Sequence, residues 1–203
     1  MPLISQNIII YRVPKTGNSW IFHVLHKGAQ TFKEKNEAKP HLTPYHFKSD
    51  KFKIAFIRHP VSWYQACYVH RVQQGWRKLT GQSDPFNDKK ILQPYESELK
   101  GKSFIQFMEY IFEARYGCVT NLYKAYLGKD LDMMDFVGKH ENLKKDLILG
   151  IRKGGEKLDE SHIINTPPKK PETLQWPVYK RSHYDEVFKM DLQIIKRYYP
   201  ETL

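Results

Sequence analysis

The segment from Ile8 to Trp20 constrains the fold of this chain more than any other. Its first four residues are apolar and mostly β-branched, as in a buried strand. A proline and a glycine then interrupt the run. Apolar residues at helical spacing follow and predict a helix capped by Asn18 or Ser19. The sequence therefore predicts a strand, a tight loop and a helix N-terminus in immediate succession.

A junction of this kind gathers unpaired backbone N–H groups and the positive end of a helix dipole. Lys15 and Thr16 add a cation and a hydroxyl to the same loop. The natural occupant is an anion such as phosphate. The loop is not a Walker A motif, because Lys15 precedes Gly17 and the earlier glycine of GxxxxGK[ST] is missing. The alternative is a plain turn, with Gly17 at positive φ and Lys15 solvated.

A second strand with a polar end follows at residues 54–57. Ile54 to Ile57 are apolar, Arg58 and His59 end the run, and Pro60 suits the first turn of a helix. An arginine at a strand end beside a helix start can bind a phosphate through two parallel hydrogen bonds. The alternative is that Arg58 pairs with a carboxylate on a neighbouring loop.

Together the two segments resemble a known family. The loop Pro-Lys-Thr-Gly-x-Ser-Trp at 14–20, followed by strand–Arg-x-Pro–helix around Arg58, is similar to the donor site of sulfotransferases that use 3′-phosphoadenosine 5′-phosphosulfate (PAPS). Phe-Ile-Arg-His-Pro-Val-Ser-Trp-Tyr at 56–64 looks especially like the small bacterial and viral members. The resemblance implies a P-loop-kinase-like sulfotransferase fold, with PAPS or its product PAP (3′-phosphoadenosine 5′-phosphate) bound as nucleotide.

The resemblance also implies roles for single residues. Arg58 would hold the 3′-phosphate together with Ser62, because the serine usual in the family is replaced by Ala66. Lys15 would neutralise the bridging oxygen as the sulfuryl group leaves. The residues expected to bind the 5′-phosphosulfate are Lys15, Thr16, Gly17, Asn18, Ser19 and Trp20.

The acceptor hydroxyl also needs a general base. His41 is our choice, because it lies on the loop between the two segments, while His46 and Glu37 remain open. No metal is required, since Lys15 and the helix N-terminus supply positive charge.

Composition limits the class of partner. The chain has 203 residues, 40% of them hydrophobic, which predicts one folded domain over 1–203. The alternation of predicted strands and helices indicates an α/β domain with a central parallel sheet flanked by helices. A net charge of +11 indicates an anionic ligand, and the scattered charges argue against nucleic acid. With no signal peptide, no apolar run of membrane length and only two cysteines, we expect a cytoplasmic protein without a membrane span.

The expected activity is sulfuryl transfer from PAPS to a hydroxyl or amine of a small-molecule or carbohydrate acceptor. The alternative is a non-catalytic anion- or polyanion-binding protein with a degenerate sulfotransferase fold. A P-loop kinase is disfavoured by the position of Lys15 and by the absence of a Walker B aspartate.

The rest of the chain alternates helices with short strands. Ser103 and Gln106 form a predicted capping box, and the triplet 152–154, although similar to an Arg-Lys-Gly phosphate contact of cytosolic sulfotransferases, is better explained as a helix stop. Long loops at 31–51 and 77–101 would set acceptor specificity. The other predicted elements are helices at 20–28, 103–114, 121–127, 140–152 and 184–199 and a strand at 135–139.

Overall fold

The structure is a computed structural model that describes residues 2–28, 32–34, 43–45, 49–73, 99–157, 159–166 and 177–203. The candidate bases His41, His46 and Glu37 lie outside these ranges, as does most of the loop 77–101. In the described part of the chain, every helix is too short or too polar to cross a membrane.

The fold is α/β, as expected, and its sheet has the strand order β3-β1-β2-β4-β5. β2 (Ile8–Tyr11), β4 (Phe52–Ile57) and β5 (Phe136–Lys139) run parallel, with Ile10 beside Ile54 and Ile54 beside Phe136. The short strands β1 (Leu3–Ile4) and β3 (Lys33–Glu34) are antiparallel additions at one edge.

The prediction of a parallel sheet was therefore wrong for that edge, and the sheet is mixed. The reason lies in the chain between β1 and β2, where the Ser5 N–H donates to the Ile8 carbonyl over 3.0 Å and closes a tight turn. Antiparallel neighbours need only such a turn, whereas parallel strands need a long crossover. A two-residue strand carries too short a pattern to be recognised in a sequence.

The chain divides into two compact units. The first comprises Met1–Arg58 and Tyr123–Lys170 and contains the sheet, and the second comprises His59–Leu122 and Pro171–Leu203. The expectation of one domain over residues 1–203 stays a prediction, and we describe each unit by itself.

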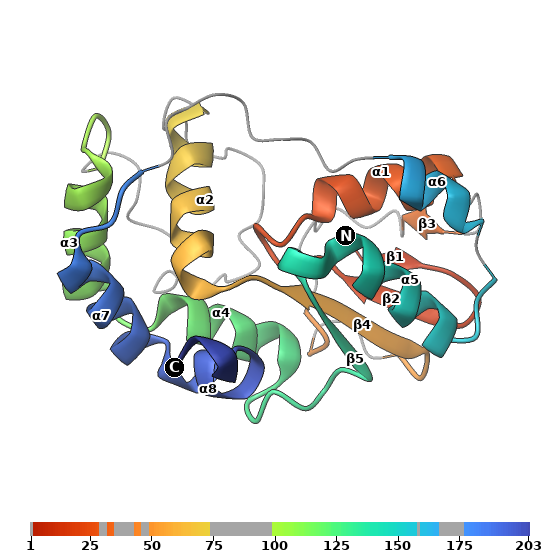
Figure 1. Ribbon diagram of the computed structural model, residues 1–203. Coiled ribbons are helices and arrows are strands. Elements are labelled where there is room, and N and C mark those ends of the chain that lie inside the picture. The colour runs from red at the N-terminus through yellow and green to blue at the C-terminus, as the bar shows by residue number, and fades with distance from the viewer. Residues whose placement is uncertain are drawn as a thin grey trace. The chain divides into compact units, whose positions relative to one another are not determined.

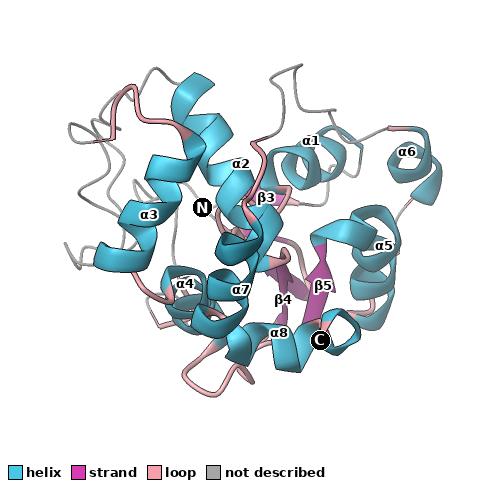
Figure 2. Cartoon of the chain, turned by 60° about the vertical axis from the view of Figure 1, so that its left-hand side comes forward, coloured by secondary structure: helices cyan, strands magenta, loops and turns pink. Residues whose placement is uncertain are grey.

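In the first unit, helices cover one face of the sheet (Figures 1 and 2). These are α1 (Asn18–Gly28), α5 (Leu143–Lys153) and α6 (Glu160–Asn165). Side chains alternate along the strands, so the apolar cluster beneath these helices includes Ile8, Ile10, Ile54 and Phe56. The residues between them, Ile9, Tyr11, Ala55 and Ile57, are also buried. Burial on both faces explains the continuous apolar runs of β2 and β4.

The described residues of the second unit form helices. It contains α2 (Pro60–Gln73), α3 (Phe104–Ala114), the first half of α4 (Cys118–Leu127), α7 (Arg181–Met190) and α8 (Leu192–Tyr198). The predicted capping box at α3 is confirmed, because the Gln106 N–H donates to Ser103 Oγ while the Ser103 N–H donates to Gln106 Oε1.

The single helix predicted at 184–199 is instead two, α7 and α8, separated at Asp191. The Asp191 carboxylate is fully buried and accepts hydrogen bonds from the Thr120 N–H, the Thr120 hydroxyl and the Tyr64 hydroxyl, each at 2.8 Å. These bonds anchor the break between α7 and α8 to α2 and α4. The apolar periodicity does not reveal a break that depends on such distant partners.

Candidate anion-binding site

Three parallel strands of the first unit end at one edge of the sheet. The chain leaves β2 through the loop 12–17, leaves β4 at Arg58 and leaves β5 at His140. Side chains that follow parallel strands meet at the same edge, where α/β proteins bind their ligands. The two segments that the sequence singled out therefore end at the same edge. His140, which the sequence did not indicate as a site residue, lies at this edge as well.

The loop after β2 has an unusual backbone. Lys15 lies at φ +65° and Gly17 at φ +90°. The left-handed region costs a residue with a side chain about 1–2 kcal/mol, so the loop holds Lys15 in an unfavourable conformation. Strain of this kind is concentrated at functional sites. It favours a functional loop over a plain turn.

Gly17 is required both by its φ and by its surroundings. A Cβ atom placed on Gly17 would lie 2.5 Å from Leu143 Cδ2 and 3.3 Å from His140 Cδ2. The loop therefore packs directly against the start of α5 and against the 3-10 turn His140–Asn142 that precedes it.

The Val13 carbonyl closes the loop from within. It accepts hydrogen bonds from Thr16 Oγ1, at 2.8 Å, and from the Asn18 side-chain amide. Thr16 is fully buried. Its hydroxyl group donates to the Val13 carbonyl and so stabilises the loop. The expected role of that hydroxyl toward a phosphate stays a prediction, although in this arrangement its proton is directed at Val13.

The helix cap differs from the prediction. The Gly17 carbonyl accepts hydrogen bonds from the backbone N–H groups of Trp20 and Ile21, at 3.0 and 3.1 Å, so Gly17 is the cap residue. Asn18 and Ser19 are instead the first two residues of α1. The cap prediction was wrong because the Asn18 side chain turns back to Val13.

The loop and the helix start leave several donors available. The backbone N–H groups of residues 16–19 donate to no other described residue. Four consecutive donors at the positive end of a helix dipole form the arrangement that binds phosphate and sulfate groups. The exposed Ser19 adds a hydroxyl at the same place.

Trp20 has a structural contact. Its side chain is 7% exposed, and its indole N–H donates to the Thr166 carbonyl over 3.1 Å, which joins α1 to the end of α6. The expected contact of Trp20 with a nucleotide stays a prediction.

Arg58 is fixed at the end of β4 through its backbone. The Arg58 N–H donates to the Tyr123 hydroxyl over 2.9 Å, and the same hydroxyl donates to the Arg58 carbonyl over 2.7 Å. Tyr123 is fully buried in α4. One phenol thus satisfies both backbone groups of the residue where the strand ends. Nothing in the sequence indicated this partner, since the two residues are 65 positions apart.

His140 lies at the end of β5, half-buried. Burial, and then the positive charge of Arg58, lower the pKa of His140 to about 4, although Glu141 acts in the opposite direction. The imidazole is therefore neutral at pH 7. The sequence pattern predicts a helix that starts at His140, whereas the structure has a 3-10 turn at His140–Asn142 before α5. The signal that identifies His140 as a candidate site residue is its position directly after β5, which is equivalent to the position of Arg58 after β4.

The remaining predicted site residues are not brought together here. Arg58 belongs to the first unit and Ser62 to the second, so their shared phosphate contact stays a prediction. The Ser62 hydroxyl donates to the His59 carbonyl over 3.0 Å in the first turn of α2. Within the described ranges no three His, Cys, Asp or Glu side chains are grouped to hold a metal, and the metal-independent mechanism also stays a prediction.

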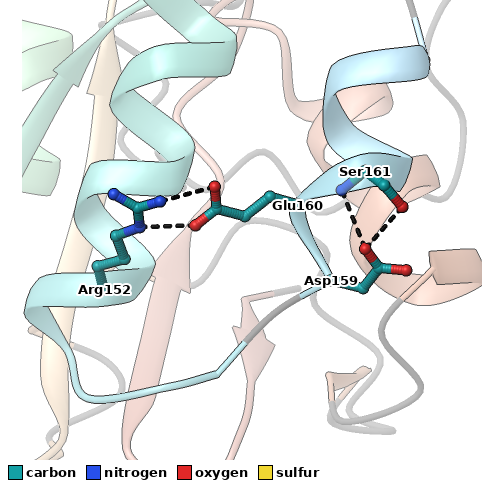
Figure 3. A network of polar contacts seen from close by, with 4 residues as sticks. All are labelled: Arg152, Asp159, Glu160 and Ser161. Carbon is teal, nitrogen blue, oxygen red and sulfur yellow. Dashed lines mark hydrogen bonds and ion pairs between the residues drawn. The ribbon is translucent and has the colours of Figure 1, made fainter.

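Arg152 belongs to the other triplet that the sequence suggested as a phosphate contact, and it lies near the amino ends of the parallel strands. Arg152 binds Glu160 of α6 through two parallel hydrogen bonds of 2.6 and 2.7 Å, and next to them Asp159 caps α6 by accepting from the Ser161 N–H (Figure 3). Gly154 packs against Ile8, where β2 begins. The triplet 152–154 therefore lies at the amino ends of the strands, away from the loop after β2.

A shallow hollow of about 560 Å³ lies at this same amino edge. It is open, and its mixed polar lining has no charged cluster to fix a phosphate. Its lining residues are Gln6, Asn7, Ser49, Asp50, Lys51 and Phe52.

Comparison of the chain with family models, with curated proteins and with solved structures gives no match in any of the three.

Proposed function

We propose that the protein is a PAPS-dependent sulfotransferase whose donor site is the carboxyl edge of β2, β4 and β5. The observation that carries the proposal is that a strained, lysine-bearing loop with free N–H groups and a strand-end arginine lie on neighbouring parallel strands. The order of these parts along the chain is the one that resembles the family.

In this proposal the loop binds the 5′ end of the donor. The backbone N–H groups of residues 16–19 would hold the 5′-phosphosulfate, and Lys15 would neutralise the bridging oxygen. The donor supplies an activated sulfuryl group. The acceptor oxygen bonds to sulfur, the bond from sulfur to the bridging oxygen breaks, PAP leaves, and the acceptor proton passes to a base.

Arg58 would bind the 3′-phosphate. Its guanidinium suits a phosphate because it donates two parallel charge-assisted hydrogen bonds. Ser62 would contribute to binding the same phosphate, because Ala66 occupies the position where the family usually has a serine. Catalysis of this type depends mainly on positioning and on charge stabilisation. The base is assigned to His41, and we propose a hydroxyl or amine acceptor on a small molecule or carbohydrate and a cytoplasmic location.

The proposal is tested by thermal unfolding with PAP, with ATP and Mg²⁺, and with heparin. PAP is expected to raise the melting temperature of the wild type, because a ligand bound only by the folded state stabilises it. ATP with Mg²⁺ is expected to have little effect. The Lys15→Ala variant is expected to respond less to PAP.

The alternative is a protein that binds polyanions without catalysis, favoured by the net charge of +11 and by Ala66. It predicts salt-sensitive binding of heparin together with no response to PAP. That result would contradict the sulfotransferase proposal.

A further inference from the structure

His140 lies at this edge, and the proposed mechanism gives it no role. It follows β5 directly, and its Cδ2 atom lies 3.3 Å from the position of a Cβ on Gly17, in contact with the loop that would hold the phosphosulfate. It therefore touches the same loop whose N–H groups remain available.

Two charged groups act directly on the His140 imidazole. The positive charge of Arg58 opposes protonation of His140, whereas the negative charge of Glu141 favours it. The Asp146 carboxylate accepts the Lys139 N–H over 2.7 Å and is occupied there. The charged residues on the surrounding elements are Arg12 and Lys15 on the loop, Arg58 after β4, Lys139 and Glu141 beside His140, and Lys144 and Asp146 in α5.

We propose that His140 belongs to the anion site and takes up a proton when a phosphate-bearing ligand binds there. This inference rests on the proposed donor site. It adds a third cationic group, present only in the complex, to Lys15 and Arg58.

The physical reason is the balance of charge around the imidazole. Without ligand, burial and the Arg58 guanidinium keep His140 neutral. A phosphate with a charge of nearly −2 offsets the charge of Arg58 and attracts the imidazolium directly. The bound anion and the protonated His140 then stabilise each other.

The consequence is a pH dependence of affinity. If binding takes up one proton, the affinity rises about tenfold for each unit by which the pH falls. This trend holds only above about pH 6. Below that pH the phosphate monoesters of the ligand take up protons themselves.

The test is titration calorimetry of the full chain with PAP and, separately, with inorganic pyrophosphate. Each titration is performed at pH 7 and pH 8 in two buffers of different ionisation enthalpy, which reports the protons taken up. We expect net proton uptake at pH 7, and less at pH 8, for the wild type and for His23→Gln, a matched change at an exposed histidine of α1. We expect none for His140→Gln.

Ring resonances of His140 in the wild type, followed by NMR against pH with and without PAP, provide a measurement that needs no variant. We expect the pKa of His140 to rise from about 4 to above 6 when the ligand is bound.

The outcomes separate this inference from the proposed function. PAP binding with an unchanged His140 titration would overturn the inference and leave the donor site intact. Pyrophosphate binding that shifts His140, without PAP binding, would support the inference and contradict the sulfotransferase proposal. Binding of neither anion would overturn both.

Discussion

Gly17 is the residue on which the shape of the loop depends. Gly17→Ala would place a methyl group at φ +90° and 2.5 Å from Leu143 Cδ2. We expect a loss of about 2–4 kcal/mol in the free energy of unfolding, from the left-handed backbone and from overpacking. Urea denaturation measures this loss.

Gly155→Ala is the matched control, because Gly155 lies at φ +76° with nothing within 4 Å of its Cβ position. Only the backbone cost of about 1–2 kcal/mol is expected there. Equal losses at the two positions would show that Gly17 is not packed against α5.

His140 makes stability depend on pH. Its folded pKa of about 4 lies below the ordinary value of 6.5. Between these values the unfolded chain binds more protons, so the contribution of His140 is complete above pH 6.5 and is lost as the pH falls toward 4. Because the imidazole keeps some solvent contact, we expect the loss to be about 1–2 kcal/mol.

The measurement is urea denaturation of the ligand-free protein at pH 7 and pH 4.5. His140→Gln is expected to lose less stability than the wild type over this interval. His23→Gln is expected to behave as the wild type, and a His140→Gln slope equal to that of the wild type would contradict the prediction.

At the scale of elements, Tyr123 connects α4 to the end of β4. Tyr123→Phe removes the hydroxyl that satisfies both backbone groups of Arg58. We expect a loss of about 1–3 kcal/mol in stability, together with weaker PAP binding because Arg58 is no longer held in place. Calorimetry with PAP measures the second effect.

The control for Tyr123→Phe comes from the same helix. Tyr126→Phe removes another fully buried phenol hydroxyl of α4 and leaves the Tyr123 hydroxyl bound to the Arg58 backbone. This variant is expected to bind PAP as the wild type does. An equal loss of affinity in both variants would assign the effect to α4 in general.

Asp191, between α7 and α8, bonds to residues of α2 and α4. Asp191→Ala would leave the Thr120 N–H and the Tyr64 hydroxyl buried without an acceptor, at an expected cost of about 2–5 kcal/mol, because each unsatisfied buried group costs about 1–3 kcal/mol. Asp191→Asn keeps one carbonyl oxygen for Thr120 and is expected to cost about 1 kcal/mol. Thermal unfolding compares the two variants. A cost for Asp191→Ala no larger than that for Asp191→Asn would show that the buried bonds contribute little.

At the scale of the whole molecule, the sequence predicted what depends on local pattern. The strands near Ile8 and Ile54, the helix after Gly17 and the capping box at Ser103 all follow from periodicity and turn chemistry. These features involve residues close together in the chain.

The features that were missed depend on distant contacts or on very short elements. The break at Asp191 requires Thr120 and Tyr64, and the anchoring of Arg58 requires Tyr123. β1 and α6 are too short for a clear period. The sequence predicted the strand before His140, but the position of His140 beside the loop also requires the order of the strands, which the sequence did not specify.

The central claim is that an anion binds at the carboxyl edge of the sheet through Arg58 and not at the amino edge through Arg152. The most direct measurement is the dissociation constant of PAP for the wild type, Arg58→Ala and Arg152→Ala. Loss of a charge-assisted pair costs about 1.5–3 kcal/mol, so we expect Arg58→Ala to bind about 10- to 150-fold more weakly. Arg152→Ala is expected to bind as the wild type does. Normal binding by Arg58→Ala, or weakened binding by Arg152→Ala alone, would contradict the account.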